Sequence, residues 1–360
     1  MMKKIEVKLG KNSYSIHIGS ALLADVGQQL RESGFAGKLV IITNPIVKGL
    51  YGDVLERKLA EEGFEVVILT VADGEEQKSL EVAGRLYTGL ADFYAERTTP
   101  VLALGGGVIG DLAGFVAATY LRGVPFVQIP TTLLAQVDSS IGGKVAVDLG
   151  QVKNIIGAFY QPGLVISDTS TLKTLPAREF TNGLAEVIKY AIACDGEFLS
   201  YIEENLDKIK ALDGEALEQV VSWSAGIKAG IVEKDERDMG LRAVLNYGHT
   251  IGHAVESASN FRMKHGEAVA VGMVAEAIIS HRLGMLGESE LNRLKSIIER
   301  AGLPAKMPKL ELEKVIQAIK HDKKILEGRL RFALPRSLGD TIITDEVGSS
   351  LVEQVLVDLE

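Results

Sequence analysis

The order of apolar patterns along the chain limits its fold more than any other feature. Short apolar runs rich in β-branched residues punctuate the first half, at 38–43, 64–70, 100–105, 126–130 and 164–168. Helical patterns at 47–62 and 79–97 lie between the first three runs. This alternation predicts βαβ units and therefore a parallel sheet. An opening hairpin is also expected within 4–19.

After about residue 175 the pattern changes to long segments with the 3.6-residue period of helices. They occupy 177–193, 196–210, 214–233, 247–259, 265–284, 287–302 and 310–322. Runs at 329–335 and 339–344 predict a small terminal strand pair. A chain of 360 residues has enough apolar sequence for two cores. We therefore expect an α/β Rossmann-like parallel-sheet domain at 1–176 and a mostly α-helical domain at 177–360, since Pro176 precedes a helix start.

Charge and composition exclude several classes of protein. The net charge of −9 argues against a nucleic-acid binder. The single cysteine, Cys194, cannot form an intrachain disulfide, which fits a reducing compartment. The N-terminal residues show no apolar signal segment, and the most membrane-like stretch, 100–121, holds Asp111 and five glycines. We expect a cytoplasmic protein that binds neither membrane nor nucleic acid.

A glycine-rich run, GGGVIGD at 105–111, ends a predicted strand and opens a predicted helix. Its glycines satisfy G-x-G-x-x-G, which lets a backbone approach a pyrophosphate at a helix N-terminus. A purely structural strand–helix turn is the alternative. In the common Rossmann arrangement this glycine loop follows the first strand, whereas here it follows the third predicted strand of the alternating pattern. The acidic residue usually found about 20 positions later is also missing. Segments 43–45 and 73–78, after the first two strands, are candidates for further dinucleotide contacts.

Three histidines suggest a metal site. His249 and His253 are four residues apart, so on a helix they share a face. Thr250 follows the first of them, so the general base of the H-E-x-x-H zinc helix is missing. His265 opens a later helix, and a catalytic zinc takes three protein ligands. Three histidines would suffice, as would two with a carboxylate, and helical histidines without a metal are the alternative.

Charged residues in apolar surroundings complete the set of candidates. Glu186 lies in an apolar helical segment, where desolvating a lone carboxylate is costly. Lys189 follows three residues later, so a simple ion pair is the alternative to a metal ligand. Several cations also lie in apolar contexts, namely Lys144, Lys153, Lys228 and Arg242. In an acidic chain they predict a focused pocket for a phosphate or carboxylate substrate.

Long motifs together resemble the 3-dehydroquinate synthase family over nearly the whole chain. They are GGGVIGDLAGFVAATYLRGVPFVQIPTTLLAQVDSSIGGKVAVD, GQVKNIIGAFYQP, NGLAEVIKY, LNYGHTIGHAVE and HGEAVAVGM. The resemblance implies an NAD-binding α/β domain and a helical metal-binding domain. It also implies a phosphate-eliminating lyase of the shikimate pathway, which converts 3-deoxy-D-arabino-heptulosonate 7-phosphate to 3-dehydroquinate. NAD and a divalent metal, zinc or cobalt, would be the cofactors.

Residue by residue, the resemblance implies Glu186, His249 and His265 as metal ligands, with His253 facing the substrate instead. Arg122 resembles the arginine that the family supplies across a dimer interface, which implies a homodimer. The implied catalytic and substrate-binding residues are Asp138, Lys144, Asn154, Lys189, Lys228, Arg242, Asn246, His253, Lys323 and Lys324.

The implied NAD contacts fall in the first domain. They are Asn44, Asp73, Gly74, Glu75, Glu76, Gln77, Lys78, Gly107, Val108, Ile109, Gly110, Asp111, Thr131, Thr132, Lys144, Lys153, Thr171, Leu172, Lys173 and Thr174. Two positions depart from the family pattern. Asn44 stands where many members have an acidic residue for the adenosine ribose, and Asp238 stands where glutamate is common.

Three other functions remain open from the sequence. A cyclase acting on sedoheptulose 7-phosphate or glucose 6-phosphate would use a substrate without a carboxylate, and the cations Lys228 and Arg242 and the pair Lys323-Lys324 favour the carboxylated one. A metal-dependent polyol dehydrogenase would release reduced cofactor. A catalytically silent NAD-binding regulator would not need the set of metal ligands.

Overall fold

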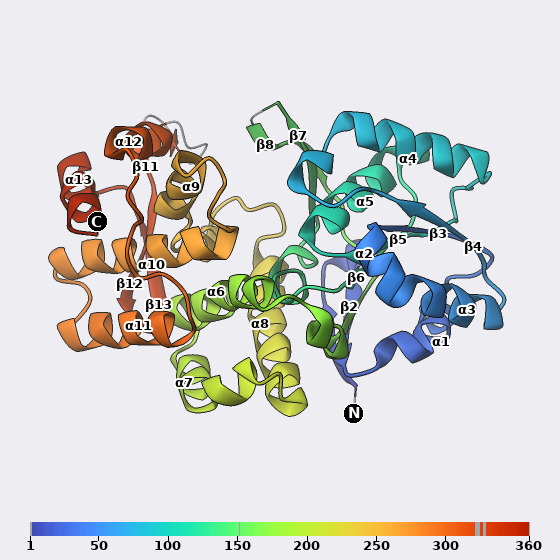
Figure 1. Ribbon diagram of the computed structural model, residues 1–360, viewed down its shortest axis with the longest axis horizontal. Coiled ribbons are helices and arrows are strands. Elements are labelled where there is room, and N and C mark those ends of the chain that lie inside the picture. Colours follow the sequence, from blue (N-terminus) through green and yellow to red (C-terminus); the bar gives the residue numbers. More distant parts are fainter. Residues whose placement is uncertain (1, 151, 321–324, 327–328, 360) are drawn as a thin grey trace. The chain divides into compact units, whose positions relative to one another are not determined.

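The computed structural model describes residues 2–150, 152–320, 325–326 and 329–359, and the chain forms two compact units (Figure 1). The first consists of Met1–Leu175 and Leu217–Arg237, and the second of Pro176–Ala216 and Asp238–Glu360. The sequence suggested a single boundary at residue 176. The chain instead returns to the first unit at Leu217, because the following helix packs there.

A seven-stranded sheet in the order β1-β2-β9-β6-β5-β3-β4 forms the centre of the first unit. Only β1 is antiparallel to its neighbour β2, and the other pairs are parallel. The predicted strands and the opening hairpin are therefore confirmed. The strands are β1 (Lys3–Val7), β2 (Tyr14–Gly19), β3 (Lys38–Thr43), β4 (Glu65–Thr70), β5 (Val101–Gly105), β6 (Phe126–Pro130) and β9 (Leu164–Asp168).

The strand order explains the unusual place of the glycine run. From β3 to β9, the spatial order β4-β3-β5-β6-β9 is the flavodoxin-like order 2-1-3-4-5. The direction of winding reverses between β3 and β5, and ligands bind outside the carboxyl ends of such a pair. The glycine run follows β5 and Asn44 follows β3, so both lie at this switch point.

Alternation along the central strands builds one core on each face of the sheet. Val40 and Ile42 of β3 belong to a core shared with α4 (Leu80–Asp92) and α5 (Gly107–Thr119). Leu39 and Ile41 belong to a second core shared with α1 (Val26–Glu32) and α3 (Asp53–Glu61). Central parallel strands are buried on both faces, so their sequences are continuously apolar.

Some predicted elements differ from the structure in the first unit. The helix expected at 47–62 is divided into α2 (Pro45–Val47), a π turn (Lys48–Gly52) and α3. The helix expected at 79–97 ends at Asp92, because Tyr94 adopts a left-handed backbone with φ 53°. A hairpin of β7 (Lys144–Leu149) and β8 (Val152–Phe159) was not predicted.

The second unit is mainly helical, as predicted, with two strand pairs. Its helices are α6 (Ala177–Cys194), α7 (Gly196–Lys210), α9 (His249–Ala258), α10 (His265–Arg282), α11 (Glu288–Arg300), α12 (Leu312–Lys320) and α13 (Ser349–Asp358). The strand pairs are β10 (Ile325–Leu326) with β11 (Arg329–Leu330) and β12 (Phe332–Ser337) with β13 (Asp340–Thr344). The helix α8 (Gly214–Lys234) begins in this unit and continues in the first.

The helix α10 lies at the centre of the second unit, where it contacts α6, α9, α11 and β12. It is buried along nearly its whole length, as expected for a helix that is apolar on all sides. The sequence analysis missed α13 and the short β10–β11 pair. Within the described ranges, no helix is both long and apolar enough to cross a membrane.

Candidate active site and metal centre

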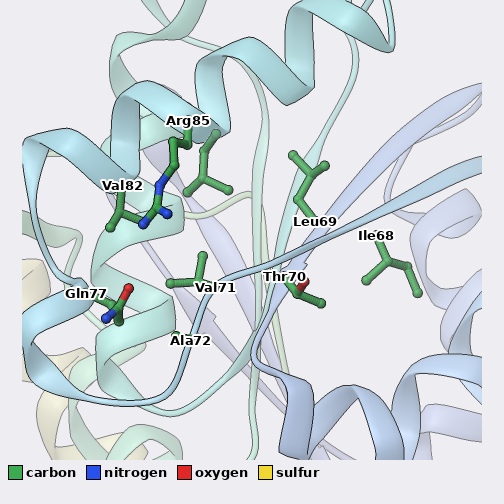
Figure 2. Close-up of a pocket in the computed structure, with 9 residues that line it drawn as sticks. Ile68, Leu69, Thr70, Val71, Ala72, Gln77, Val82 and Arg85 are labelled. Carbon is green, nitrogen blue, oxygen red and sulfur yellow. The ribbon is translucent and has the colours of Figure 1, made fainter.

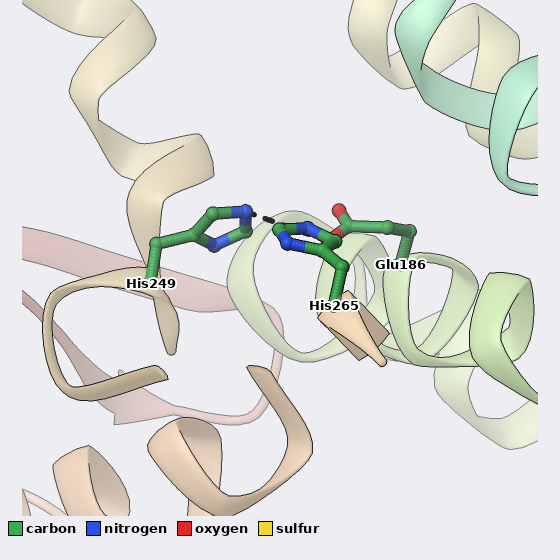
Figure 3. Close-up of side chains that lie close together, drawn as sticks. All are labelled: Glu186, His249 and His265. Atoms are coloured by element: carbon green, nitrogen blue, oxygen red, sulfur yellow. Dashed lines mark ion pairs between the residues drawn. The ribbon is translucent and has the colours of Figure 1, made fainter. Parts of the chain in front are cut away.

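Three side chains of the second unit direct their ligand atoms at one point, as Figure 3 shows. Glu186 lies in the middle of α6, while His249 and His265 open α9 and α10. The Glu186 Oε1 atom is 3.4 Å from His249 Nε2 and 3.3 Å from His265 Nε2. A tetrahedral zinc with bonds of about 2.0–2.1 Å separates its ligand atoms by about 3.3 Å. The donor set therefore fits zinc or a similar divalent ion.

The far nitrogens of both imidazoles have partners that fix the rings. The Nδ1 atom of His249 lies 3.1 Å from the backbone carbonyl oxygen of Tyr247. The Nδ1 atom of His265 lies 3.5 Å from a carboxylate oxygen of the buried Glu256. When Nδ1 donates to such an oxygen, Nε2 keeps a lone pair for a metal. The sequence analysis missed Glu256, although its place seven residues after His249 puts both on one face of α9.

The position of Lys189 shows that Glu186 can form an ion pair and serve as a metal ligand at the same time. Its Nζ atom lies 2.5 Å from Glu186 Oε2, and both side chains are almost completely buried. The ion pair uses Oε2, whereas Oε1 faces the two histidines. Lys189 therefore orients the carboxylate and leaves one oxygen for a metal.

The electric field of this site favours positive charge. Burial lowers the pKa of His265, but the hydrogen bonds and negative charges of Glu186 and Glu256 outweigh that effect and raise the pKa to about 10. A divalent cation would meet the same attraction from these carboxylates. Among the described residues, this is the one group of three or more His, Cys, Asp or Glu side chains with such geometry.

His253 lies beside the metal group but outside it. Its ring centroid is 5.2 Å from that of His249 and 5.8 Å from that of His265, and the residue is exposed. Of the two histidines that the i,i+4 spacing placed on one helix face, His249 belongs to the metal group and His253 does not, as the family resemblance implied. Arg242 is buried and Asn246 half-buried in the short 3-10 helix just before α9. Lys323 and Lys324 lie outside the described residues.

In the first unit, the Lys78 side chain contacts the end of the glycine run and the strand β8. Its Nζ atom lies 2.6 Å from Asp111 at the start of α5, and it also donates to the Asn154 side-chain oxygen on β8. Burial lowers the pKa of Lys78, but Asp111 and the nearby Glu75 and Asp148 outweigh it and raise the pKa. The ammonium group therefore stays charged beside the glycine run.

Lys228 of α8 belongs to the first unit, not to the helical one. Its Nζ atom donates to both the backbone and the side-chain oxygen of Asp138, each at 2.7 Å. Lys144 opens β7 and is exposed. Arg122 is exposed as well, and it has a left-handed backbone, as do Leu121 and Gly123, with φ values of 69°, 50° and 121°.

All predicted NAD-binding residues lie in the first unit. Asn44 caps α2 by accepting from the Val47 N–H at 2.8 Å, and it donates to Asp73 at 3.0 Å. A carboxylate at position 44 could not donate to Asp73, so the departure from the family pattern has a local partner. At the other end of the predicted set, the Tyr51 hydroxyl contacts Thr171 and Thr174.

A cavity of about 360 Å³ lies between the end of β4 and α4 (Figure 2). Most of its lining residues are apolar, and Arg85 and Gln77 are the larger polar side chains. Gln77 alone among its lining residues belongs to the predicted cofactor set, so the cavity does not by itself locate a cofactor. The lining residues are Ile68, Leu69, Thr70, Val71, Ala72, Gln77, Val82, Arg85 and Leu86.

Comparison with known proteins covers almost the whole chain. Residues 68–182 match the family model described as 3-dehydroquinate synthase N-terminal, and residues 183–325 match the C-terminal model. The 3-dehydroquinate synthase of Pelotomaculum thermopropionicum is 48% identical over 99% of this chain and 96% of its own. The chain belongs to the 3-dehydroquinate synthase family. The synthase of Desulforamulus reducens is 49% identical over 99% of both chains.

Solved structures share the fold of this chain over nearly its whole length. A 2-epi-5-epi-valiolone synthase from Streptomyces hygroscopicus with NAD⁺ and Zn²⁺ bound is 29% identical, with a TM-score of 0.90 over 98% of both chains. A 2-deoxy-scyllo-inosose synthase complexed with carbaglucose-6-phosphate, NAD⁺ and Co²⁺ is 25% identical, with a TM-score of 0.91 over 99% of this chain and 100% of that one. A glycerol dehydrogenase from Schizosaccharomyces pombe, 17% identical with a TM-score of 0.68, shares only the fold.

Proposed function

We propose that this protein is a 3-dehydroquinate synthase, which converts 3-deoxy-D-arabino-heptulosonate 7-phosphate to 3-dehydroquinate and phosphate. The observation that carries the proposal is full-length identity near 48% to synthases of that name, in a chain whose Glu186, His249 and His265 lie together in a geometry that suits a metal ion.

NAD and a divalent metal, zinc or cobalt, are the proposed cofactors. Related cyclases that contain NAD⁺ with Zn²⁺ or Co²⁺ support this assignment. When bound, NAD supplies a transient hydride acceptor and the metal a Lewis acid for substrate hydroxyls. The glycine run at the β3–β5 switch point and the charged Lys78 beside it are suited to hold an anionic dinucleotide.

The protein's own residues bind the metal, orient its ligands and neutralise the anionic substrate. Glu186, His249 and His265 hold the metal, and Lys189 fixes the orientation of the Glu186 carboxylate. Asp138 holds the Lys228 ammonium through two hydrogen bonds, so the ammonium group is preorganised for an anionic substrate. Such fixed cations stabilise negative charge without reorganising during the reaction. The substrate roles of Lys144, Asn154, Arg242, Asn246, His253, Lys323 and Lys324 are part of the same proposal.

Phosphate release from the carboxylated heptulosonate phosphate tests the proposal. We expect release to require both NAD and metal, to stop with a chelator and to return when zinc or cobalt is added. NADH should not accumulate, because the hydride returns to the substrate within one turnover. Stoichiometric NADH would identify a dehydrogenase instead, and activity that ignores the chelator would contradict the metal assignment.

A cyclase for an uncarboxylated sugar phosphate is the second candidate, because the TM-scores to such cyclases reach 0.90 and 0.91. Their identities of 25–29% are well below the 48–49% of the 3-dehydroquinate synthases, which favours the first candidate. Parallel assays with sedoheptulose 7-phosphate and glucose 6-phosphate separate the two. Turnover of either at the rate of the heptulosonate phosphate would reverse the preference.

We further propose a homodimer in which Arg122 acts in the partner's active site. Its exposure on a left-handed turn supports this role, since strained backbone is often retained at functional positions. Arginine also pairs with phosphate through two parallel hydrogen bonds. The cytoplasmic location expected from the sequence stays a proposal, which cell fractionation would test.

Mixing subunits tests the role of Arg122. A chain that carries both Arg122→Ala and His249→Ala is mixed with wild type at equal amounts and allowed to exchange. If Arg122 acts in the partner, both sites of every mixed dimer fail. If it acts in its own subunit, the wild-type site of each mixed dimer keeps working, and that result would exclude the cross-subunit role.

A further inference from the structure

The two helices that begin with metal ligands touch backbone to backbone. A side chain on Gly272 of α10 would place its Cβ only 1.9 Å from the Gly248 carbonyl oxygen. One helical turn away, a Cβ on Gly252 would lie 3.0 Å from the Ala268 carbonyl oxygen. Because Gly248 meets Gly272 and Gly252 meets Ala268, the helices run in opposite directions.

The first turn of α9 lacks an ordinary cap. A helix leaves its first backbone N–H groups without partners inside the helix, and a Ser, Thr, Asp or Asn at the N-cap usually accepts from one of them. The N-cap of α9 is Gly248, which has φ 77° and no side chain that could accept. The N-cap residue therefore supplies no side-chain acceptor for this turn.

Glu276 of α10 supplies that acceptor. One of its oxygens accepts from the Gly248 N–H at 2.6 Å, and the other accepts from the Ile251 N–H at 3.3 Å. The side chain is completely buried. A carboxylate at a helix N-terminus is also favoured by the helix dipole. The backbone contact of α9 with Gly272 brings these N–H groups within reach.

A second contact from α10 holds the residue before the cap. The Tyr247 hydroxyl donates to the Met273 carbonyl oxygen at 2.7 Å. Burial, together with the negative charge of Glu276, raises the pKa of Tyr247 well above its usual value, so the hydroxyl remains a donor. The Tyr247 carbonyl oxygen is the partner of the His249 ring. Contacts from α10 thus fix the Tyr247–Gly248 backbone. This backbone sets both the position and the orientation of the His249 ring.

We propose that Glu276 is a positioning residue of the metal centre, which fixes the start of α9 and so sets His249 relative to His265. The inference rests on the metal assignment in the proposed function. Glu276 acts on α9 through its hydrogen bonds from the Gly248 and Ile251 backbone N–H groups. Because α10 begins with His265, the same helix supplies one ligand and places the other.

Glu276→Gln is the decisive variant, because it keeps the shape of the side chain but puts an NH₂ group against one of the two buried N–H donors. The full-length protein is stripped of metal and titrated with Co²⁺, whose visible absorption reports on coordination. We expect Co²⁺ to bind at least about tenfold more weakly, as for other residues that orient metal ligands, with a changed spectrum. Amide hydrogen exchange at Gly248 and Ile251 should become faster than in wild type.

Ser280→Ala is the matched control on the same helix. It removes a buried hydrogen bond that α10 makes to β12 rather than to α9, from the Ser280 hydroxyl to the Pro335 carbonyl oxygen at 2.5 Å. This variant should lose stability and yet bind Co²⁺ with the wild-type affinity and spectrum. An equal loss of Co²⁺ affinity in Ser280→Ala would show that Glu276 acts only through general stability, and it would overturn the inference.

Two further outcomes are decisive. If Glu276→Gln does not fold, Glu276→Asp takes its place, because it keeps the charge but shortens the reach by one methylene, and the same weaker Co²⁺ binding is expected. Wild-type Co²⁺ affinity and spectrum in either folded variant would refute the positioning role. Failure of the wild-type protein to bind Co²⁺ would instead refute the metal assignment, so the two hypotheses fail separately.

Discussion

The geometry of the three histidines allows one prediction to be worked out in detail. Replacing His249 with alanine removes one of three ligand atoms, whereas replacing His253 removes a ring outside the ligand group. Both residues lie on α9 and are four residues apart, so the two variants are well matched. They should differ in metal affinity far more than in stability.

The size of the difference follows from the ligand count. Zinc binding to four-ligand structural sites is worth about 10–16 kcal/mol, or about 2.5–4 kcal/mol for each ligand. Since each 1.4 kcal/mol is about tenfold, His249→Ala should weaken zinc binding by about two to three orders of magnitude. His265→Ala should weaken zinc binding by a similar factor, because the Nε2 atoms of His249 and His265 lie at similar distances from Glu186 Oε1. His253→Ala should change affinity by less than about threefold.

Competition with a colorimetric zinc chelator measures these affinities, and metal analysis after desalting gives the bound stoichiometry. Thermal unfolding of the metal-free variants controls for damage to the fold. Equal losses of zinc affinity in His249→Ala and His253→Ala would refute the ligand assignment. Retention of full affinity in His265→Ala would refute it too.

Further predictions concern three other residues of the second unit. Glu256→Gln removes the charge beside His265 Nδ1, so zinc affinity should fall about 10- to 100-fold, between the two histidine variants, as measured by the same chelator competition. Gly272→Ala would force α9 and α10 apart at a backbone contact, so both metal content and melting temperature should drop; wild-type values would contradict the packing. Burial raises the pKa of the Cys194 thiol to about 11, against 9.0 for an ordinary thiol. At pH 8 its thiolate fraction, and hence its rate with a disulfide reagent, should be at least about 100-fold lower in the native protein than in the urea-unfolded chain. The same shift makes the unfolded chain lose its thiol proton first, so this group's contribution to stability should decline between pH 9 and 11, which urea titrations at several pH values would detect.

The sheet and most helices were predictable because burial imposes a regular period on the sequence. Strands such as β3 and β5 are buried on both faces, so they read as uninterrupted apolar runs. The β7–β8 hairpin was missed because β8 is exposed along most of its length, which removes the alternation that marks a half-buried strand. The helix α13 does carry a helical pattern of buried Val352, Val355 and Leu356, which the sequence analysis overlooked.

The candidate site was predictable only where side chains carry the chemistry. The histidine spacing suggested a metal, but spacing alone could not separate His253 from the ligands. Glu186 was ambiguous because a carboxylate has two oxygens, and the structure shows that one faces Lys189 and the other faces the histidines. Glu276 left no signal, since it acts on backbone N–H groups up to 28 residues away in sequence.

The return of the chain to the first unit has a consequence for protein synthesis. The side chains of Gln219 and Glu233 hold Lys3 and the Lys8 backbone at the opening hairpin, more than 200 residues away in sequence. These contacts cannot form on the ribosome until about 60 residues beyond Leu175 have been made, which takes about 3–12 s at ordinary bacterial rates. The nascent first unit must wait for α8 in an incomplete state. By the same connectivity, a protease cut between 176 and 216 would leave the first unit as two fragments held together only by such noncovalent contacts.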